Sequence, residues 1–449
     1  MSFSIFKTQA AAHPKRPTKK HLRTWVALAF VIPLTIVPPV WAKEPAQPVK
    51  HAGTGTAISA AEMAQIIPTD PALLKGQLSN GIQYYILHHT QPSGMAELRL
   101  AIRAGSNNET EAERGLAHFL EHMVFNGTKR YPGNKMVDAL ENMGVQFGTD
   151  LNAYTGFDET IYILPIPLNR PGNLNTGMEM MEELAFNAVF DPTEVEQERP
   201  VIMEEWRASS QSAAARQQEH NLKVVAKGSR YAERTPMGLT SVIQKATPDQ
   251  LRQFYKRWYR PDQMAIIVVG DVEPKEIQKQ IEQRFGKYTN PKEAVSRPNL
   301  NLPNNVEPSV GVFKDPTLTQ NSVMLAHKNK KDFVPLDTTG AYVQTMRINL
   351  MTRMINQRLQ AQLDGATPDF LQAAAEVDYV SGLVRSKQAL HWYAVAAPGQ
   401  EGKTLEALHR EAQRIVQYGF TQSELDRAVR AQMTYLNSDS NNYQKATEY

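Results

Sequence analysis

Residues 114–128 read RGLAHFLEHMVFNGT, and this stretch decides how the whole chain is interpreted. Apolar residues recur in it at helical spacing, which predicts an amphipathic helix over residues 111–125 with one buried stripe. The stripe consists of Leu116, Phe119, Leu120, Met123 and Val124. His118 and His122 are four residues apart, so they lie one turn apart on a different face, and Glu121 points to the same polar side.

The HxxEH order of these three residues suits a catalytic zinc ion. Two neutral imidazoles on successive turns can bind one zinc ion, and a neighbouring carboxylate can act as a general base toward water. The chain has no cysteine, so a metal site must use histidine and carboxylate ligands. The alternative is an accidental pair, but the added glutamate lowers that chance to roughly a few per cent. We therefore expect His118 and His122 to bind zinc and Glu121 to activate water.

The positive charge of the chain is concentrated at its start. Residues 1–42 carry six basic residues and no acidic one, which leaves 43 basic and 46 acidic residues in the rest. We therefore expect no nucleic-acid partner. The basic stretch precedes an apolar run at residues 25–40, which predicts an export signal and a periplasmic or extracellular protein. An uncleaved membrane anchor is the alternative, but Pro33, Pro38 and Pro39 interrupt the run and favour a signal with no stable span in the mature protein.

Beyond residue 42 the chain divides into segments of different character. Residues 43–74 are rich in Ala, Pro, Thr and Gly and predict a flexible lead-in. A first domain is expected over residues 75–290, where strands alternate with helices. The strands are expected at residues 84–87, 98–102, 159–164 and 265–270, and the helices at residues 111–125, 175–188 and 192–226. Residues 291–308 predict a linker, and a second domain follows over residues 309–449.

One segment of the second domain resembles a segment of the first in sequence. Phe190–Val195 resembles Phe420–Leu425, and each segment is expected to open a helix, which indicates two related domains. The first domain continues for 82 residues beyond Phe190 to Val272, whereas 29 residues follow Phe420. The second copy is therefore expected to stop before its last helices and closing strand. A second domain that is simply shorter is the alternative.

Residues 114–128 resemble the signature of the insulinase/pitrilysin family of zinc metallopeptidases (peptidase family M16), in which HxxEH is inverted relative to HExxH. Further matches to the family's motifs are at residues 150–155, 158–160, 231–238, 255–271 and 354–359. The resemblance covers residues 75–449. It implies an α+β fold of two related M16-type (LuxS/MPP-like) domains, with a zinc site in the first domain. It also implies hydrolysis of peptides or unfolded protein segments.

The resemblance further implies a third zinc ligand within a Glu-x6-Glu pair, which Glu198 and Glu205 match. It makes Glu205 the ligand and Glu198 a group that orients the site. Seven residues span nearly two helical turns, so both carboxylates face one way, whereas Glu204 lies about 100° around the helix from Glu205. Pro200 falls between the pair and should kink the helix or remove a backbone hydrogen bond. Without the resemblance these glutamates would be an ordinary charged helix face.

Substrate binding is expected beside the metal. Residues 152–155 are expected to form an edge strand that pairs with an extended peptide by β-addition. Asn152, Ala153 and Tyr154 would then contact the substrate. An ordinary sheet strand is the alternative.

The chain also departs from the family's architecture. Family members enclose substrate between two halves, and this chain matches the N-terminal one. The expected protein is therefore an active endopeptidase. The alternative is a truncated or non-catalytic subunit that binds peptide or zinc and needs a separate C-terminal half, or a homodimer, for activity. The intact HxxEH sequence favours the active enzyme.

Overall fold

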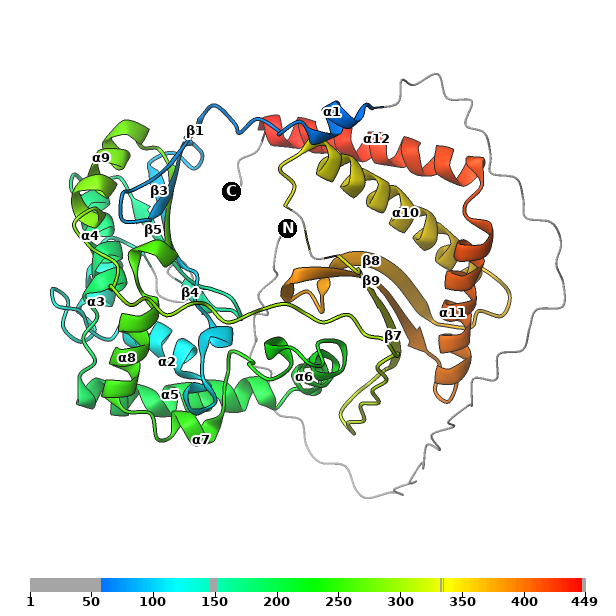
Figure 1. The fold of residues 1–449 in the computed structure, drawn as a ribbon, viewed down its shortest axis with the longest axis horizontal. Helices are drawn as coiled ribbons and strands as arrows, with labels where there is room; N and C mark the ends of the chain where they lie inside the picture. The colour runs from blue at the N-terminus through cyan, green and yellow to red at the C-terminus, as the bar shows by residue number, and fades with distance from the viewer. Residues whose placement is uncertain (1–57, 146–151, 332, 334, 446–449) are drawn as a thin grey trace. The chain divides into compact units, whose positions relative to one another are not determined.

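The computed structural model describes residues 58–145, 152–331, 333 and 335–445. The predicted signal at residues 1–42 and the first part of the lead-in lie outside the described residues. Within the described ranges, no helix has the length and apolar character needed to cross a membrane. Sheets covered by helices make up the fold, so the predicted α+β class is confirmed (Figure 1).

The first domain is built on a six-stranded sheet. Its strands are β1 (Leu73–Gln77), β2 (Gln83–His88), β3 (Met95–Ile102), β4 (Asn152–Thr155), β5 (Thr160–Pro167) and β6 (Met264–Gly270). Their order is β1-β2-β6-β3-β5-β4, in which β2 and β6 are parallel and the other neighbours are antiparallel. Buried and partly exposed residues alternate along β3, β5 and β6, so one face of the sheet supplies the core.

The helices of this domain pack on the sheet or on one another (Figure 1). They are α2 (Leu116–Met123), α3 (Lys135–Asn142), α4 (Asn173–Phe186), α5 (Pro192–Ser210), α6 (Ala213–Val225), α7 (Thr240–Ile243), α8 (Pro248–Trp258) and α9 (Pro274–Phe285). Helix α4 packs on β3 and β5, and α2 contacts β4, α5 and α8. Because α2 is enclosed by three elements, the orientation of its side chains is fixed by the core.

Two predicted helical segments differ from the observed ones. The helix expected at residues 111–125 is a 3-10 turn at Glu111–Glu113 followed by α2, because Gly115 has a φ of +105° that interrupts the helix. The segment expected at residues 192–226 is divided into α5 and α6. The hydroxyl of Ser212 accepts a hydrogen bond from the N–H of Ala215 at 3.0 Å and caps the start of α6.

The second domain has a smaller sheet. Its elements are β7 (Asn321–Lys328), α10 (Thr339–Leu363), β8 (Gln372–Val380), β9 (Val384–Ala396), α11 (Glu401–Tyr418) and α12 (Gln422–Lys445). The sheet order is β7-β9-β8, with both pairs antiparallel. Helix α10 packs against β8, and α11 packs against β7 and β9. The core between them includes Ile355, Trp392 and Leu408.

The two domains share one arrangement of strands. Strands β3, β4 and β5 are paired in the order β3-β5-β4, and β7, β8 and β9 repeat this order and direction. Helices α5 and α12, which follow the two similar segments noted in the sequence, begin at Pro192 and Gln422. The prediction of two related domains is confirmed. In the first domain β6 also pairs with β3, whereas no described strand pairs with the corresponding side of β7.

The segment between the domains has no regular structure but is packed. Residues 286–320 contain no helix or strand, and they include the predicted linker at residues 291–308. Leu302 is buried there in an apolar cluster with Phe157 and Val384. Both domains therefore contribute to the surroundings of this segment.

A second connection lies near the start of the described chain, after the short helix α1 (Ala60–Ala64). The N–H of Ile67 donates to the carbonyl of Asp337, and the N–H of Thr339 donates to that of Gln65, each at 2.9 Å. These bonds attach residues 65–67 to the beginning of α10 before the chain enters β1 (Figure 1).

Candidate metal centre

Helix α2 is anchored at its first turn. Glu109 is fully buried, and its Oε1 accepts a hydrogen bond from the N–H of Ala117 at 2.8 Å. This satisfies one of the amides that a helix start leaves free. Burial raises the pKa of Glu109 to about 8. The predicted apolar stripe is completely buried, as Leu116, Phe119, Leu120, Met123 and Val124 show. The polar side of α2 is thereby turned toward α5.

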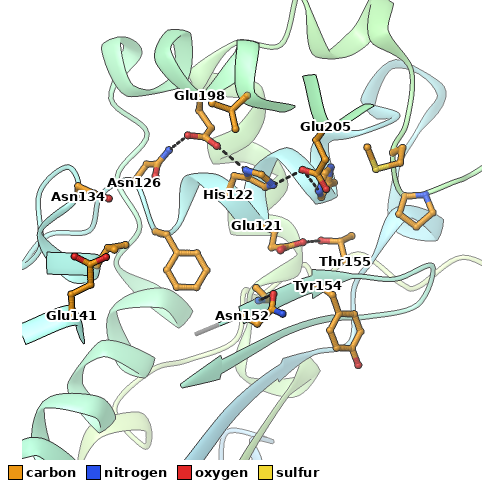
Figure 2. A pocket seen from close by; sticks show the side chains of 17 residues that line it. Glu121, His122, Asn126, Asn134, Glu141, Asn152, Tyr154, Thr155, Glu198 and Glu205 are labelled. Carbon is orange, nitrogen blue, oxygen red and sulfur yellow. Dashed lines mark hydrogen bonds and ion pairs between the residues drawn. The ribbon is translucent and has the colours of Figure 1, made fainter. Parts of the chain in front are cut away.

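His118 and His122 meet Glu205, which comes from α5 (Figure 2). Oε2 of Glu205 lies 3.6 Å from Nε2 of His118 and 3.4 Å from Nε2 of His122. The two rings are nearly perpendicular, with centroids 4.8 Å apart. Nδ1 of His118 is buried and has no hydrogen-bond partner among the described residues, so packing orients this ring.

These three side chains fit a zinc ion. One ligand atom from each lies within 4.8 Å of the other two. Tetrahedral ligands at about 2.0–2.2 Å from zinc are roughly 3.3–3.6 Å apart, which matches the two histidine–glutamate distances. Two imidazoles and one carboxylate are also a donor set used by catalytic zinc sites. The pair predicted from spacing and the third ligand implied by the family resemblance are thus brought together.

Glu198 lies on the other side of His122. Its Oε1 is 2.7 Å from Nδ1 of His122, and Nδ2 of Asn126 donates to its Oε2 at 2.5 Å (Figure 2). With Nδ1 held by Glu198, Nε2 of His122 is the nitrogen that faces Glu205. Asn126 was not among the predicted site residues, although its position four residues after His122 is a signal that could have indicated it.

Helix α5 continues through Pro200 and keeps both glutamates directed at α2. The helix is thus unbroken between Glu198 and Glu205, and Pro200 provides no backbone N–H within it. Arg199 attaches this part of the helix to the rest of the domain, because it donates to the carbonyls of Ile243 and Ala246. This attachment supports α5 at the position where proline weakens it.

Glu121 is buried in the same cleft as His118, His122 and Glu205, and a strand residue holds its carboxylate. The hydroxyl of Thr155, at the end of β4, donates to Oε2 of Glu121 at 2.6 Å (Figure 2). Burial raises the pKa of Glu121 to about 7, although this hydrogen bond opposes the shift. A carboxyl group with such a pKa can exchange a proton near neutral pH. This role of Thr155 was not predicted, since no local spacing relates Thr155 to Glu121.

The two histidines differ in their affinity for protons when no metal is bound. Burial and the neighbouring His122 lower the pKa of His118 to about 4. Burial also opposes protonation of His122, but hydrogen bonds to Glu198 and Glu205 raise its pKa to about 10. His118 is therefore neutral, as a metal ligand must be, and a metal ion would displace a proton from His122.

A cleft of about 680 Å³ opens over this centre and is bordered by β4. Strand β4 is the last strand of the sheet order, so it is an edge among the described strands. Ala153 packs against the core and Thr155 points to Glu121, whereas Asn152 and Tyr154 are exposed. Figure 2 shows Tyr154 directed away from Glu121. All three residues expected to contact substrate thus line the cleft.

Comparison with protein families gives two adjacent matches. The sequence profile described as Insulinase (Peptidase family M16) matches residues 84–239. The profile described as Peptidase M16 inactive domain matches residues 245–432. The metal centre lies in the first of these segments, and the sheet of β7, β9 and β8 lies in the second.

Individual relatives match most of the chain. The chain is 34% identical over 383 residues to the probable zinc protease PqqL of Escherichia coli. This alignment covers 83% of this chain and 40% of that protein. The probable zinc protease PqqL of Haemophilus influenzae is 33% identical, with 83% of this chain and 39% of that protein covered. The crystal structure of the first half of the periplasmic protease PqqL from Escherichia coli has a TM-score of 0.74 and 33% identity, covering 85% of this chain and 80% of that one. The chain thus spans about 40% of the length of these curated relatives.

Proposed function

The chain belongs to the insulinase family, peptidase family M16, and from that premise we propose that it is a zinc-dependent metalloendopeptidase. Its proposed substrates are peptides or unfolded protein segments. The observation that carries the proposal is the meeting of His118, His122 and Glu205 from two helices beside a cleft that also contains Glu121.

Each residue of the centre has a proposed role. His118, His122 and Glu205 hold zinc, which when bound supplies the Lewis acidity that polarises the scissile carbonyl. Glu121 takes a proton from the attacking water and passes it to the leaving amine. Thr155 holds Oε2 of Glu121, so Oε1 is the oxygen assigned to the proton transfer.

Two further groups support this chemistry. Glu198 orients the ring of His122 through the hydrogen bond to Nδ1. The edge of β4 binds an extended peptide by adding it to the sheet, so that Asn152, Ala153 and Tyr154 contact the substrate. Pairing along β4 places the peptide backbone beside the metal ligands and Glu121.

The proposed function also gives a role to each segment of the chain. Residues 75–290 form the catalytic domain, residues 291–308 the linker, and residues 309–449 a non-catalytic second domain. Residues 1–42 are assigned as an export signal, which agrees with the periplasmic location stated for the PqqL structure. The proposed location is periplasmic or extracellular.

A second candidate function is favoured by the length of the match. Because 85% of the chain aligns with the crystal structure of the first half of PqqL, it also suits the role of an M16 subunit that binds zinc and peptide. Such a subunit would cleave peptides after joining a separate C-terminal half or a second copy of itself.

Zinc content and peptide cleavage, measured on the same preparation, test both candidates. We expect about one zinc ion per chain and cleavage of an unstructured peptide that a chelator abolishes. Glu121→Gln is expected to keep the metal and lose cleavage, and unimpaired cleavage by this variant would overturn the proposed base. Zinc binding without cleavage, followed by cleavage after addition of the C-terminal half of PqqL, would support the subunit.

A further inference from the structure

One side chain of the second domain reaches the strand that is proposed to bind substrate. Arg385 is near the start of β9, and its guanidinium lies 2.7 Å from Oε1 of Glu159. Burial raises the pKa of Tyr154, and the same guanidinium, which lies beside the Tyr154 hydroxyl, lowers it. Tyr154 belongs to β4, and Glu159 belongs to the turn that joins β4 to β5. Arg385 therefore contacts both the strand and its turn.

The turn is held by hydrogen bonds inside the first domain, but the carboxylate of Glu159 pairs with a residue of the second domain. The N–H of Gly156 donates to the carbonyl of Glu159 at 2.7 Å. The carboxylate of Asp158 accepts hydrogen bonds from Tyr231 at 2.7 Å and from Asn107 at 3.0 Å. The side chain of Glu159 is only 15% exposed, and Arg385, which pairs with its carboxylate, comes from the second domain. A carboxylate with so little access to water depends on such a partner.

Apolar contacts bring the two hairpins together at the same place. Phe157, in the turn between β4 and β5, is buried in one cluster with Val380 and Val384. These two valines are paired at the end of the β8–β9 hairpin, and Val384 directly precedes Arg385. The position of Arg385 is thus set by packing on both sides of the interface, because the valines next to it are completely buried.

Strand β4 connects this interface to the metal centre. Neighbouring residues of a strand point to opposite faces, so Thr155 is directed toward Glu121 while Tyr154 points away from it (Figure 2). On that other face the Tyr154 hydroxyl lies beside Arg385. Strand β4 has only four residues and pairs with β5 alone among the described strands. A contact that restrains one face of so short a strand also restrains the other face.

We propose that Arg385 of the second domain is a positioning residue for the first. Through Glu159 and Tyr154 it holds the β4–β5 hairpin where β4 can pair with a peptide and Thr155 can hold Glu121. The catalytic part of this inference rests on the proposed function, whereas the restraint of the hairpin does not. The domain that carries no metal ligand thereby takes part in the arrangement of the site.

Amide hydrogen exchange of the full chain tests the restraint without any need for activity. In Arg385→Ala, exchange at residues 152–160 is expected to be about threefold to fivefold faster, the size that loss of a partly exposed ion pair supports. Exchange in α2 and the zinc content should stay as in the wild type. Unchanged exchange at residues 152–160 would overturn the proposal, whether or not the chain proves to be a peptidase.

A matched control separates this effect from general loosening of the second domain. Arg410 is also an exposed arginine of that domain, and it pairs with Asp369 at 2.8 Å. Arg410→Ala should leave exchange at residues 152–160 unchanged, and an equal effect of both variants would contradict the specific role of Arg385. Reversal of the pair, in the double variant Glu159→Arg with Arg385→Glu, should restore slower exchange, and failure to do so would exclude the ion pair as the cause.

Kinetics give a second readout in the active protein. Loss of the restraint should raise KM for a peptide substrate by about threefold or more, with a smaller decrease in kcat, because pairing along β4 is weakened while the zinc ligands are untouched. Arg385→Lys should recover part of this loss, since it keeps the charge next to Glu159. An unchanged KM in Arg385→Ala would show that the hairpin needs no help from the second domain.

Discussion

The hydroxyl of Thr155 donates to Oε2 of Glu121 at 2.6 Å, so the end of the edge strand is joined directly to the helix that carries both histidines. This hydrogen bond also opposes the burial that raises the pKa of Glu121. The position of β4 and the basicity of Glu121 are therefore linked. A peptide that pairs with β4 binds to a strand that already holds the proposed general base.

Removal of this hydroxyl should impair catalysis and spare the metal. In Thr155→Val, a hydrogen bond to a charged group is lost at nearly constant side-chain volume, and kcat is expected to fall by about tenfold to a hundredfold. Zinc content should not change. Thr155→Ser keeps the hydroxyl and serves as the control. Full activity in Thr155→Val would show that the bond has no part in the reaction.

Substitution of two adjacent glutamates of α5 should affect zinc binding differently. Glu205→Gln removes a proposed ligand and should weaken zinc binding by more than about a hundredfold, measured by competition with a chelator. Glu204 is paired with Arg207 on the exposed side of the helix, so Glu204→Gln should bind zinc as the wild type does. Tight zinc binding by Glu205→Gln would exclude Glu205 as the third ligand.

Loss of the charge on Glu198 should have a smaller effect on the same measurement. Glu198→Gln weakens the hydrogen bond that orients His122, and zinc affinity should fall by about tenfold to a hundredfold. Asn126→Ala removes the hydrogen bond that holds the other oxygen of Glu198, and its effect should be smaller still. If Glu198→Gln left zinc affinity unchanged, His122 would need no such orientation.

The second domain should lose stability in acid through one ion pair. Nε of Arg358 in α10 lies 2.6 Å from Oε1 of Glu424 in α12, and this contact lowers the pKa of Glu424 to about 2 from an ordinary value of 4.5. A lowered carboxyl pKa stabilises the fold above pH 4.5, and the contribution disappears as the pH falls toward 2. The melting temperature of Glu424→Gln should therefore lie below that of the wild type at neutral pH, and the difference should shrink below pH 4.5. A difference independent of pH would contradict this assignment.

The local part of the site could be predicted from the sequence because a helix has a fixed period. The four-residue spacing of His118 and His122 places both rings on one face, and the apolar residues between them define the buried side. The structure confirms both features. The strands at residues 84–87, 98–102, 159–164 and 265–270 and the two related domains followed from the same kind of periodic and repeated pattern, whereas β1, β7, β8 and β9 were not predicted.

The remaining site residues come from contacts that no local spacing records. Glu205 meets the histidines only because α5 packs against α2, so its prediction depended on the family resemblance. Thr155 reaches Glu121 from a strand whose place is set by the sheet order. Arg385 comes from another domain altogether. Each of these contacts is set by the tertiary structure. Because the residues are far apart in the chain, no sequence periodicity relates them.

The attachment of residues 65–67 to the beginning of α10 has a mechanical consequence. The chain passes from one domain to the other at this point and again through residues 286–320, so the two domains are joined by a pair of tethers. Two points of attachment restrict the relative movement of the domains more than one would. Detachment of residues 65–67 would leave residues 286–320 and the buried contacts of Phe157 with Val380 and Val384 to hold the domains together.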